Sequence, residues 1–85
     1  MRRHRIHVPS PLQHVIVALR EVPRTIVELT EPDRGLVHLE DGVGLLHHQG
    51  GITVLDLLEF NEGRHVHTVI KVLRGAGFQV NHRAT

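Results

Sequence analysis

The stretch that decides the fold is residues 25–58, TIVELTEPDRGLVHLEDGVGLLHHQGGITVLDLL. Its β-branched and apolar runs are separated by three turn sequences, at residues 31–35 (EPDRG), 41–42 (DG) and 49–51 (QGG). Short apolar runs between such turns predict an antiparallel meander with strands at 25–30, 36–40, 43–47 and 52–58.

Residues 52–60 also fit a helix. Thr53 followed by Asp56 resembles a helix-capping signal, and Val54, Leu57 and Leu58 could line one helical face. In that alternative, residues 53–60 and 62–74 form the helix pair of a winged helix. The sequence leaves the choice open.

Two amphipathic segments flank the meander. Ser10, as an N-cap before Pro11, begins a helix over about residues 11–21, and a second helix is expected over 62–74. The apolar positions of both recur at helical spacing: Leu12, Val15, Ile16, Leu19 and Val22, then Val66, Val69, Ile70 and Leu73. Strands are predicted at residues 5–8 and 78–81, before the first helix and after the second.

This order of elements predicts an α+β domain, a ferredoxin-like antiparallel sheet with an extended β-meander and two helices on one face. Residues 69–80, VIKVLRGAGFQV, resemble the last helix and strand of heavy-metal-associated domains, and residues 12–29 are loosely similar to the first helix and second strand of that family. The family binds metal through Cys-x-x-Cys at the start of its first helix. Here that region is Pro9-Ser10-Pro11-Leu12, so the resemblance implies the fold but no metal.

Length and composition limit the number of domains and the kinds of site that this chain can have. The 85 residues suit a single domain, 1–85, with residues 1–4 as a disordered basic tail. Cysteine is absent, so neither disulfides nor thiolate metal sites are expected. The longest apolar runs are too short to span a bilayer, and no apolar segment follows the basic N-terminus. We therefore expect a cytoplasmic protein without a membrane association.

Nine histidines are the most unusual feature of the composition. Histidine titrates near neutrality and is a common metal ligand. His65 and His67 are the best local metal candidates, because on an extended backbone they would lie on one side. On a helix they would point about 200° apart and could not share an ion.

Charge is distributed unevenly, at +4 over residues 1–20, −7 over 21–62 and +4 over 63–85. We therefore expect a non-catalytic binding module, a regulatory or inhibitory accessory protein that docks a protein partner by charge complementarity. Sheet edges could also support a homo-oligomer. The expected partner-binding residues are Arg2, Arg3, Arg5, Arg64, Lys71 and Arg74.

Two other functions compete with protein docking. The basic termini could bind nucleic acid, and the histidines could form a divalent-metal or pH sensor. Catalysis has little support, because Ser10 is the only serine and no carboxylate pair or phosphate-binding loop stands out. We expect no enzyme activity and no cofactor.

Overall fold

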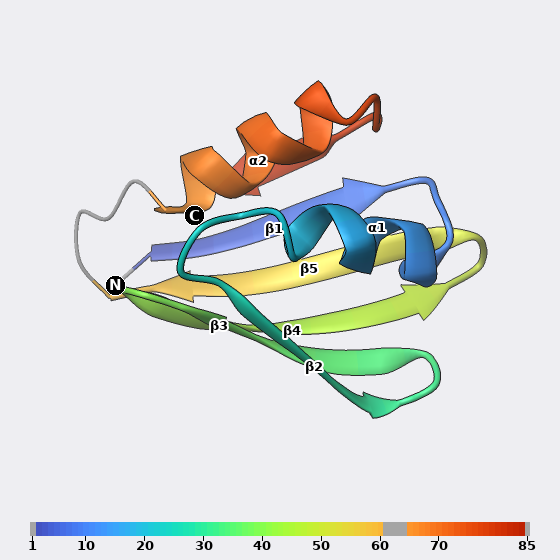
Figure 1. The fold of residues 1–85 in the computed structure, drawn as a ribbon, viewed down its shortest axis with the longest axis horizontal. Helices are drawn as coiled ribbons and strands as arrows, with labels where there is room; N and C mark the ends of the chain where they lie inside the picture. Colours follow the sequence, from blue (N-terminus) through green and yellow to red (C-terminus); the bar gives the residue numbers. More distant parts are fainter. Residues whose placement is uncertain (1, 61–64, 85) are drawn as a thin grey trace.

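A computed structural model of the chain describes residues 2–60 and 65–84 (Figure 1). Six strands and two helices follow one another along the chain: β1 (Arg2–Val8), α1 (Leu12–Leu19), β2 (Ile26–Glu31), β3 (Arg34–Leu39), β4 (Gly42–Gln49), β5 (Ile52–Glu59), α2 (His65–Gly75) and β6 (Asn81–Ala84). The fold class is therefore α+β, as the sequence predicted.

The strands form one antiparallel sheet in the order β2-β3-β4-β5-β1-β6. Strands β2 to β5 are consecutive neighbours, which confirms the meander. Residues 52–59 are strand β5, at the centre of the sheet, so the helical alternative for this segment and the winged helix built on it are wrong. Thr53, Leu55, Leu57 and Glu59 are buried at alternate positions of β5, which fits a strand with one face in the core; Val54, on the other face, is also buried.

Both helices lie on the same side of the sheet and contact each other (Figure 1). The apolar stripes predicted for the two helices are buried in the core, and they meet the inward side chains of the sheet there. The members from the sheet are Ile6, Val8, Val37, Leu39, Leu46, Leu55 and Leu57. The chain has two phenylalanines and no tyrosine or tryptophan, and the buried core is aliphatic.

The turn between β3 and β4 differs by one residue from the prediction. Leu39 pairs with Gly42, so the two-residue loop is Glu40-Asp41 and Gly42 already belongs to β4. A Cβ atom on Gly42 would collide with the carbonyl oxygen of Leu58 on the neighbouring strand. Glycine is needed here for a close approach between strands and not for the turn.

Both chain ends also differ from the expectation. Arg2, Arg3 and His4, which we expected in a disordered tail, extend β1 because they pair with residues 57–59 of β5. The last strand covers residues 81–84 and not 78–81. Residues 78–80 are the return path from the end of α2, where the Phe78 N–H donates to the Leu73 carbonyl at 3.1 Å and Gly77 has a φ of 93°.

Ser10 is not the N-cap of α1. Pro11 occupies that position, and no side chain caps the helix. The Ser10 N–H donates to the Val8 carbonyl at 2.8 Å, and the Ser10 carbonyl accepts a hydrogen bond from the buried hydroxyl of Thr53 at 2.7 Å. The residue therefore ties the β1–α1 connection to β5.

Candidate functional site

The sheet has one side covered by the helices and one side that is not. Because side chains alternate along a strand, the neighbours of the inward residues point to the uncovered side, which we call the open face. Its residues include Ile26, Glu28 and Glu31 on β2, Arg34, Leu36 and His38 on β3, Val43, Leu45, His47 and Gln49 on β4, Ile52, Val54, Asp56 and Leu58 on β5, Arg3, Arg5 and His7 on β1, and Asn81 and Arg83 on β6. Neither helix reaches this surface.

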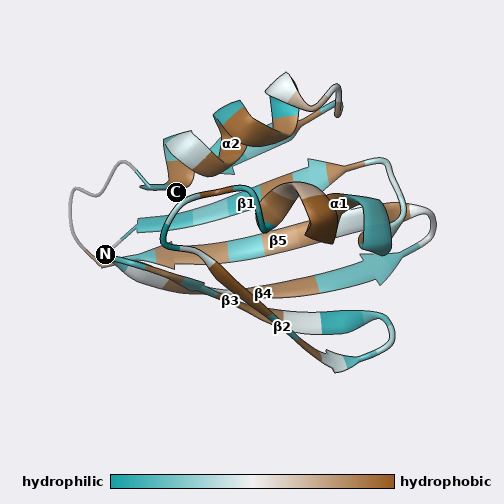
Figure 2. Ribbon diagram, viewed as in Figure 1, coloured by the Kyte–Doolittle hydropathy of each residue, from teal (hydrophilic) through white to brown (hydrophobic). Residues whose placement is uncertain are grey.

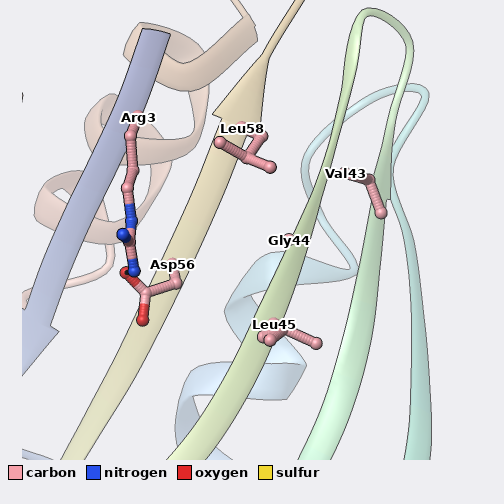
Figure 3. A pocket seen from close by; sticks show the side chains of 6 residues that line it. All are labelled: Arg3, Val43, Gly44, Leu45, Asp56 and Leu58. Atoms are coloured by element: carbon pink, nitrogen blue, oxygen red, sulfur yellow. Dashed lines mark ion pairs between the residues drawn. The ribbon is translucent and has the colours of Figure 1, made fainter. Parts of the chain in front are cut away.

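The centre of the open face is apolar. Leu45 is 58% exposed and Leu58 is 36% exposed, although both stand on central strands. The hydrophobic colouring runs along β4 until its last residues (Figure 2). A shallow hollow of about 270 Å³ lies there, with Val43, Leu45 and Leu58 along its apolar side (Figure 3). This volume is below the range of typical small-molecule pockets, about 300–1,000 Å³, so the hollow suits a single protruding side chain.

A charged cluster borders this hollow. Figure 3 shows the Arg3 and Asp56 side chains pointing toward each other, with 3.5 Å between Arg3 Nη2 and Asp56 Oδ1. The Arg5 guanidinium donates to both oxygens of Asp56, at 3.1 and 3.3 Å. That hydrogen-bonded arginine, with the positive charges nearby, lowers the pKa of Asp56, which stays ionised near neutrality.

The opposite side of the sheet holds a buried polar cluster. His4 on β1 and Glu59 on β5 are 1% and 4% exposed, and 2.8 Å separates His4 Nε2 from Glu59 Oε2. His4 Nδ1 lies 2.8 Å from Nε2 of His82 on β6. The planes of the two imidazoles are inclined by 16° and their centroids are 5.1 Å apart, so the rings meet through their nitrogen-bearing edges. Three strands are thus joined through side chains.

The order of donors in this cluster follows from its chemistry. If Glu59 is ionised it only accepts, so His4 Nε2 donates to it. A neutral His4 then accepts at Nδ1 from the Nε2–H of His82. When both imidazoles are protonated they carry only donors toward each other, so the bond between them cannot survive. Burial, with the nearby His4, His67 and Arg74, lowers the pKa of His82 and keeps it neutral at neutral pH.

The two histidines predicted as metal ligands lie on α2. His65 uses both ring nitrogens within the fold: Nδ1 accepts from the Glu40 N–H at 3.1 Å, and Nε2 lies 2.9 Å from the Pro23 carbonyl. His67 is exposed two residues further along the same helix, where it cannot share an ion with His65. Within residues 2–60 and 65–84, no group of three or more ligand-type side chains is arranged to hold a metal ion.

The predicted partner-binding residues are divided between two surfaces. Arg3 and Arg5 belong to the open face, whereas Lys71 and Arg74 are exposed on α2, on the other side of the sheet. Arg2 lies at the exposed start of β1. Arg64 falls outside the residues that the structure describes. These predicted residues therefore do not form one common surface in the part of the chain that the structure describes.

Sequence reasoning missed His4, Glu59 and His82, because they are far apart in the chain. Strand alternation was the available signal. His4 continues the inward series of Ile6 and Val8, and Glu59 continues that of Leu55 and Leu57. A polar residue in an inward series predicts a buried polar contact, although not its partner.

The fold and these two sites define a small α+β domain with an uncovered sheet face. No family model and no curated protein matches the chain. Among solved structures, the chain is similar to the NMR structure of PA4090 from Pseudomonas aeruginosa, with a TM-score of 0.60 and 19% identity over 98% of this chain and 96% of that chain. At this identity the similarity concerns the fold. Separately, no helix in the described part of the chain is long and apolar enough to cross a membrane.

Proposed function

We propose that the protein is a small non-catalytic docking module whose open face binds a protein partner in a regulatory or inhibitory role. The observation that carries this proposal is the exposed Leu45 at the centre of an uncovered sheet. Antiparallel sheets usually turn a polar face to water. A contiguous apolar area with a polar rim is typical of an interaction surface. We also propose the cytoplasm as its compartment, because a chain without cysteine suits a reducing environment.

The charged residues around the apolar centre of the open face favour a protein partner over an unspecific apolar ligand. Arg3, Arg5 and Arg83 lie at one side of the apolar centre, and Glu28 lies at the other. Charges around an apolar centre select and orient a partner. The hollow beside Leu45 then receives one apolar side chain of that partner.

The test uses Leu45→Glu as the disruptive variant and Val17→Glu as its matched control. Val17 is 63% exposed on α1, so the same change is made on the side that the proposal does not use. Each immobilised protein is exposed to host lysate, and captured proteins are quantified by mass spectrometry. We expect a protein captured by the wild type and by Val17→Glu to be lost with Leu45→Glu. Equal capture by all three would contradict the proposal.

The nucleic-acid alternative is tested beside it. Lys71→Glu with Arg74→Glu reverses the charge of α2, and Arg3→Glu with Arg83→Glu reverses that of the open face. We expect none of these proteins to show tight duplex binding. Salt-sensitive DNA binding by the wild type that either reversal abolishes would favour a nucleic-acid binder.

A second candidate function is a response to pH, and the buried His4–His82 contact favours it. The charged or titratable groups around the contact are Glu59 from β5 and His67 and Arg74 from α2. Acidification that protonates His82 places a positive charge in this partly buried site beside His67 and Arg74, and so loosens β6 from β1. The pH dependence of stability, given in the Discussion, is its test.

We further propose that the sheet is ferredoxin-like, enlarged by the β3–β4 hairpin. Without these two strands the order is β2-β5-β1-β6. In both strand–helix–strand units, β1-α1-β2 and β5-α2-β6, at least one antiparallel strand separates the two strands of the unit, as in a split βαβ. The heavy-metal-associated resemblance is then one of fold, and metal binding is not part of the proposal.

A further inference from the structure

We propose that the partner on the open face is a second copy of this chain, packed sheet against sheet. The inference rests on the proposed function, since it names the occupant of the same surface. The strand register aligns one residue from each strand in a row that crosses the open face at right angles to the strands. In order from β2 to β6, this row is Glu28, Leu36, Leu45, Asp56, Arg5 and Arg83.

The two ends of this row carry opposite charge. On β2, Glu28 and Glu31 outnumber the neighbouring Arg34 of β3. At the opposite edge, β1 and β6 carry three positive charges, those of Arg3, Arg5 and Arg83, whereas the adjacent β5 carries one negative charge, that of Asp56. The face is therefore acidic at one edge, apolar in the middle and basic at the other edge. Two copies of such a surface are complementary in charge when the strand order of one copy runs opposite to that of the other.

Symmetry then selects the arrangement. Two sheets that face each other can be related by a twofold axis across the strands or along them. An axis across the strands stacks each strand on its own copy, so acids meet acids and arginines meet arginines. An axis along the strands reverses the order and brings the acidic edge over the basic one. Charge complementarity therefore favours the axis along the strands.

The apolar residues fix the position of the axis on β4. Strand β4 carries Val43 and Leu45, and β2 and β1 lie two strands away on its two sides. Leu45 then faces Leu45 of the second copy, and Glu28 faces Arg5 of the second copy. Twisted sheets packed in this way keep their strands within about 30° of each other.

The size of the face fits a stable dimer. The molecule measures 31 × 26 × 24 Å, so one whole face covers roughly the 800 Å² that each partner contributes to a standard interface. Nearly the entire open face must take part, which includes both charged edges.

The sheet edges are less suited to self-association. Strand β6 has four residues, and the pairing of β2 shifts in register between Leu29 and Glu31. Short edge strands and bulges are devices that prevent edge-to-edge pairing. Edge pairing would also leave Leu45 in water. Self-association through the open face therefore accounts for the exposed Leu45 and for the short or irregular edge strands, whereas edge pairing accounts for neither.

Sedimentation equilibrium from micromolar to several hundred micromolar protein tests the inference. The wild type and the Val17→Glu control are expected to dimerise, and Leu45→Glu to weaken dimerisation by about a hundredfold. Two charge variants test the axis. Glu28→Arg alone sets arginine against arginine, and Arg5→Glu alone sets glutamate against glutamate. Each is expected to weaken its own dimer about tenfold.

An equimolar mixture of Glu28→Arg and Arg5→Glu restores opposite charges at both symmetric contacts and is expected to associate like the wild type. Circular dichroism checks that each variant is folded. If Arg5→Glu does not fold because Asp56 loses its hydrogen-bonded arginine and gains a like charge beside it, the comparison of Leu45→Glu with Val17→Glu still decides.

A wild type that is monomeric throughout, or a dimer that survives Leu45→Glu, would overturn the inference. The latter result would place the contact at an edge. If the wild type is monomeric but a captured protein is still lost with Leu45→Glu, only the self-association proposal is wrong. The proposal of a docking module that binds a different protein then stands. If neither association responds to Leu45→Glu, both proposals fail.

Discussion

The imidazole of His4 and the carboxylate of Glu59 lie 2.8 Å apart, 55 residues apart in sequence, on the helix side of the sheet. Both are almost completely buried, and Glu59 Oε1 has no hydrogen-bond partner among the described residues. A buried pair of this kind contributes little beyond an apolar pair of the same size. Either member alone, however, leaves an unpaired polar group in the core.

A double-mutant cycle tests this relationship. Glu59→Leu or His4→Leu alone should lower the free energy of unfolding by about 3–5 kcal/mol, because the atom that bonded to the removed side chain, His4 Nε2 or Glu59 Oε2, stays buried without that partner. The double variant should lose less than either single change. Urea unfolding of the four proteins measures the coupling. Additive losses would mean that the two side chains do not depend on each other.

Stability should fall in mild acid because of His82. Its folded-state pKa is lowered from 6.5, first by burial and then by His4, His67 and Arg74. As the pH drops below 6.5, the unfolded chain therefore binds more protons than the folded one. The loss continues until the pH reaches the folded-state pKa. Thermal unfolding between neutral pH and about pH 5 should show a declining Tm.

His82→Asn should flatten this pH dependence, whatever it does to the Tm at neutral pH. His14→Gln, on the exposed side of α1, is the control and should keep the wild-type slope. An unchanged slope in His82→Asn would refute the pH-responsive candidate function.

The packing of the two helices on the sheet gives a third prediction. Leu19 and Ile70 are 0% and 5% exposed in the common core. Leu19→Ala and Ile70→Ala should each cost about 2–5 kcal/mol of unfolding free energy, through lost burial and the cavity that remains. Val17→Ala, at an exposed position, should change it little. A loss below about 0.5 kcal/mol at both core positions would contradict the packing.

A fourth prediction concerns zinc. His65 already bonds to the backbone of Glu40 and Pro23, and His67 lies elsewhere on the helix surface. Zinc titration against a competing chelator should therefore detect no stoichiometric nanomolar site. Tight binding that His65→Ala together with His67→Ala abolishes would reinstate the metal-sensor hypothesis.

The periodic parts of this fold could be predicted from the sequence. The turn residues at 31–35 and 49–51 located the meander, and helical spacing located α1 and α2. Ambiguity arose where both periods fit, because Val54, Leu57 and Leu58 suit a helix while Leu55 and Leu57 suit the buried side of a strand. Residues 52–59 form a strand because β5 pairs with β4 and β1 on its two sides. This pairing depends on the tertiary fold and cannot be read from local periodicity.

The sites were harder to predict than the fold. The cluster of His4, Glu59 and His82 depends on strand order, which brings β5, β1 and β6 together. The row from Glu28 to Arg83 depends on register across six strands. Local sequence gives neither. Sequence charge predicted Arg3 and Arg5 together with Lys71 and Arg74 as partner-binding residues, and the fold places the two pairs on opposite sides of the sheet.

Intermolecular NOEs in a mixture of ¹³C-labelled and unlabelled protein show which side chains of two copies touch, and so whether the open face is the contact between them. We expect contacts between the Leu45 and Val43 methyl groups of the labelled copy and the open face of the unlabelled one, all of them lost in Leu45→Glu. Contacts confined to residues 26–31 or 81–84, or none at the highest concentration, would contradict it.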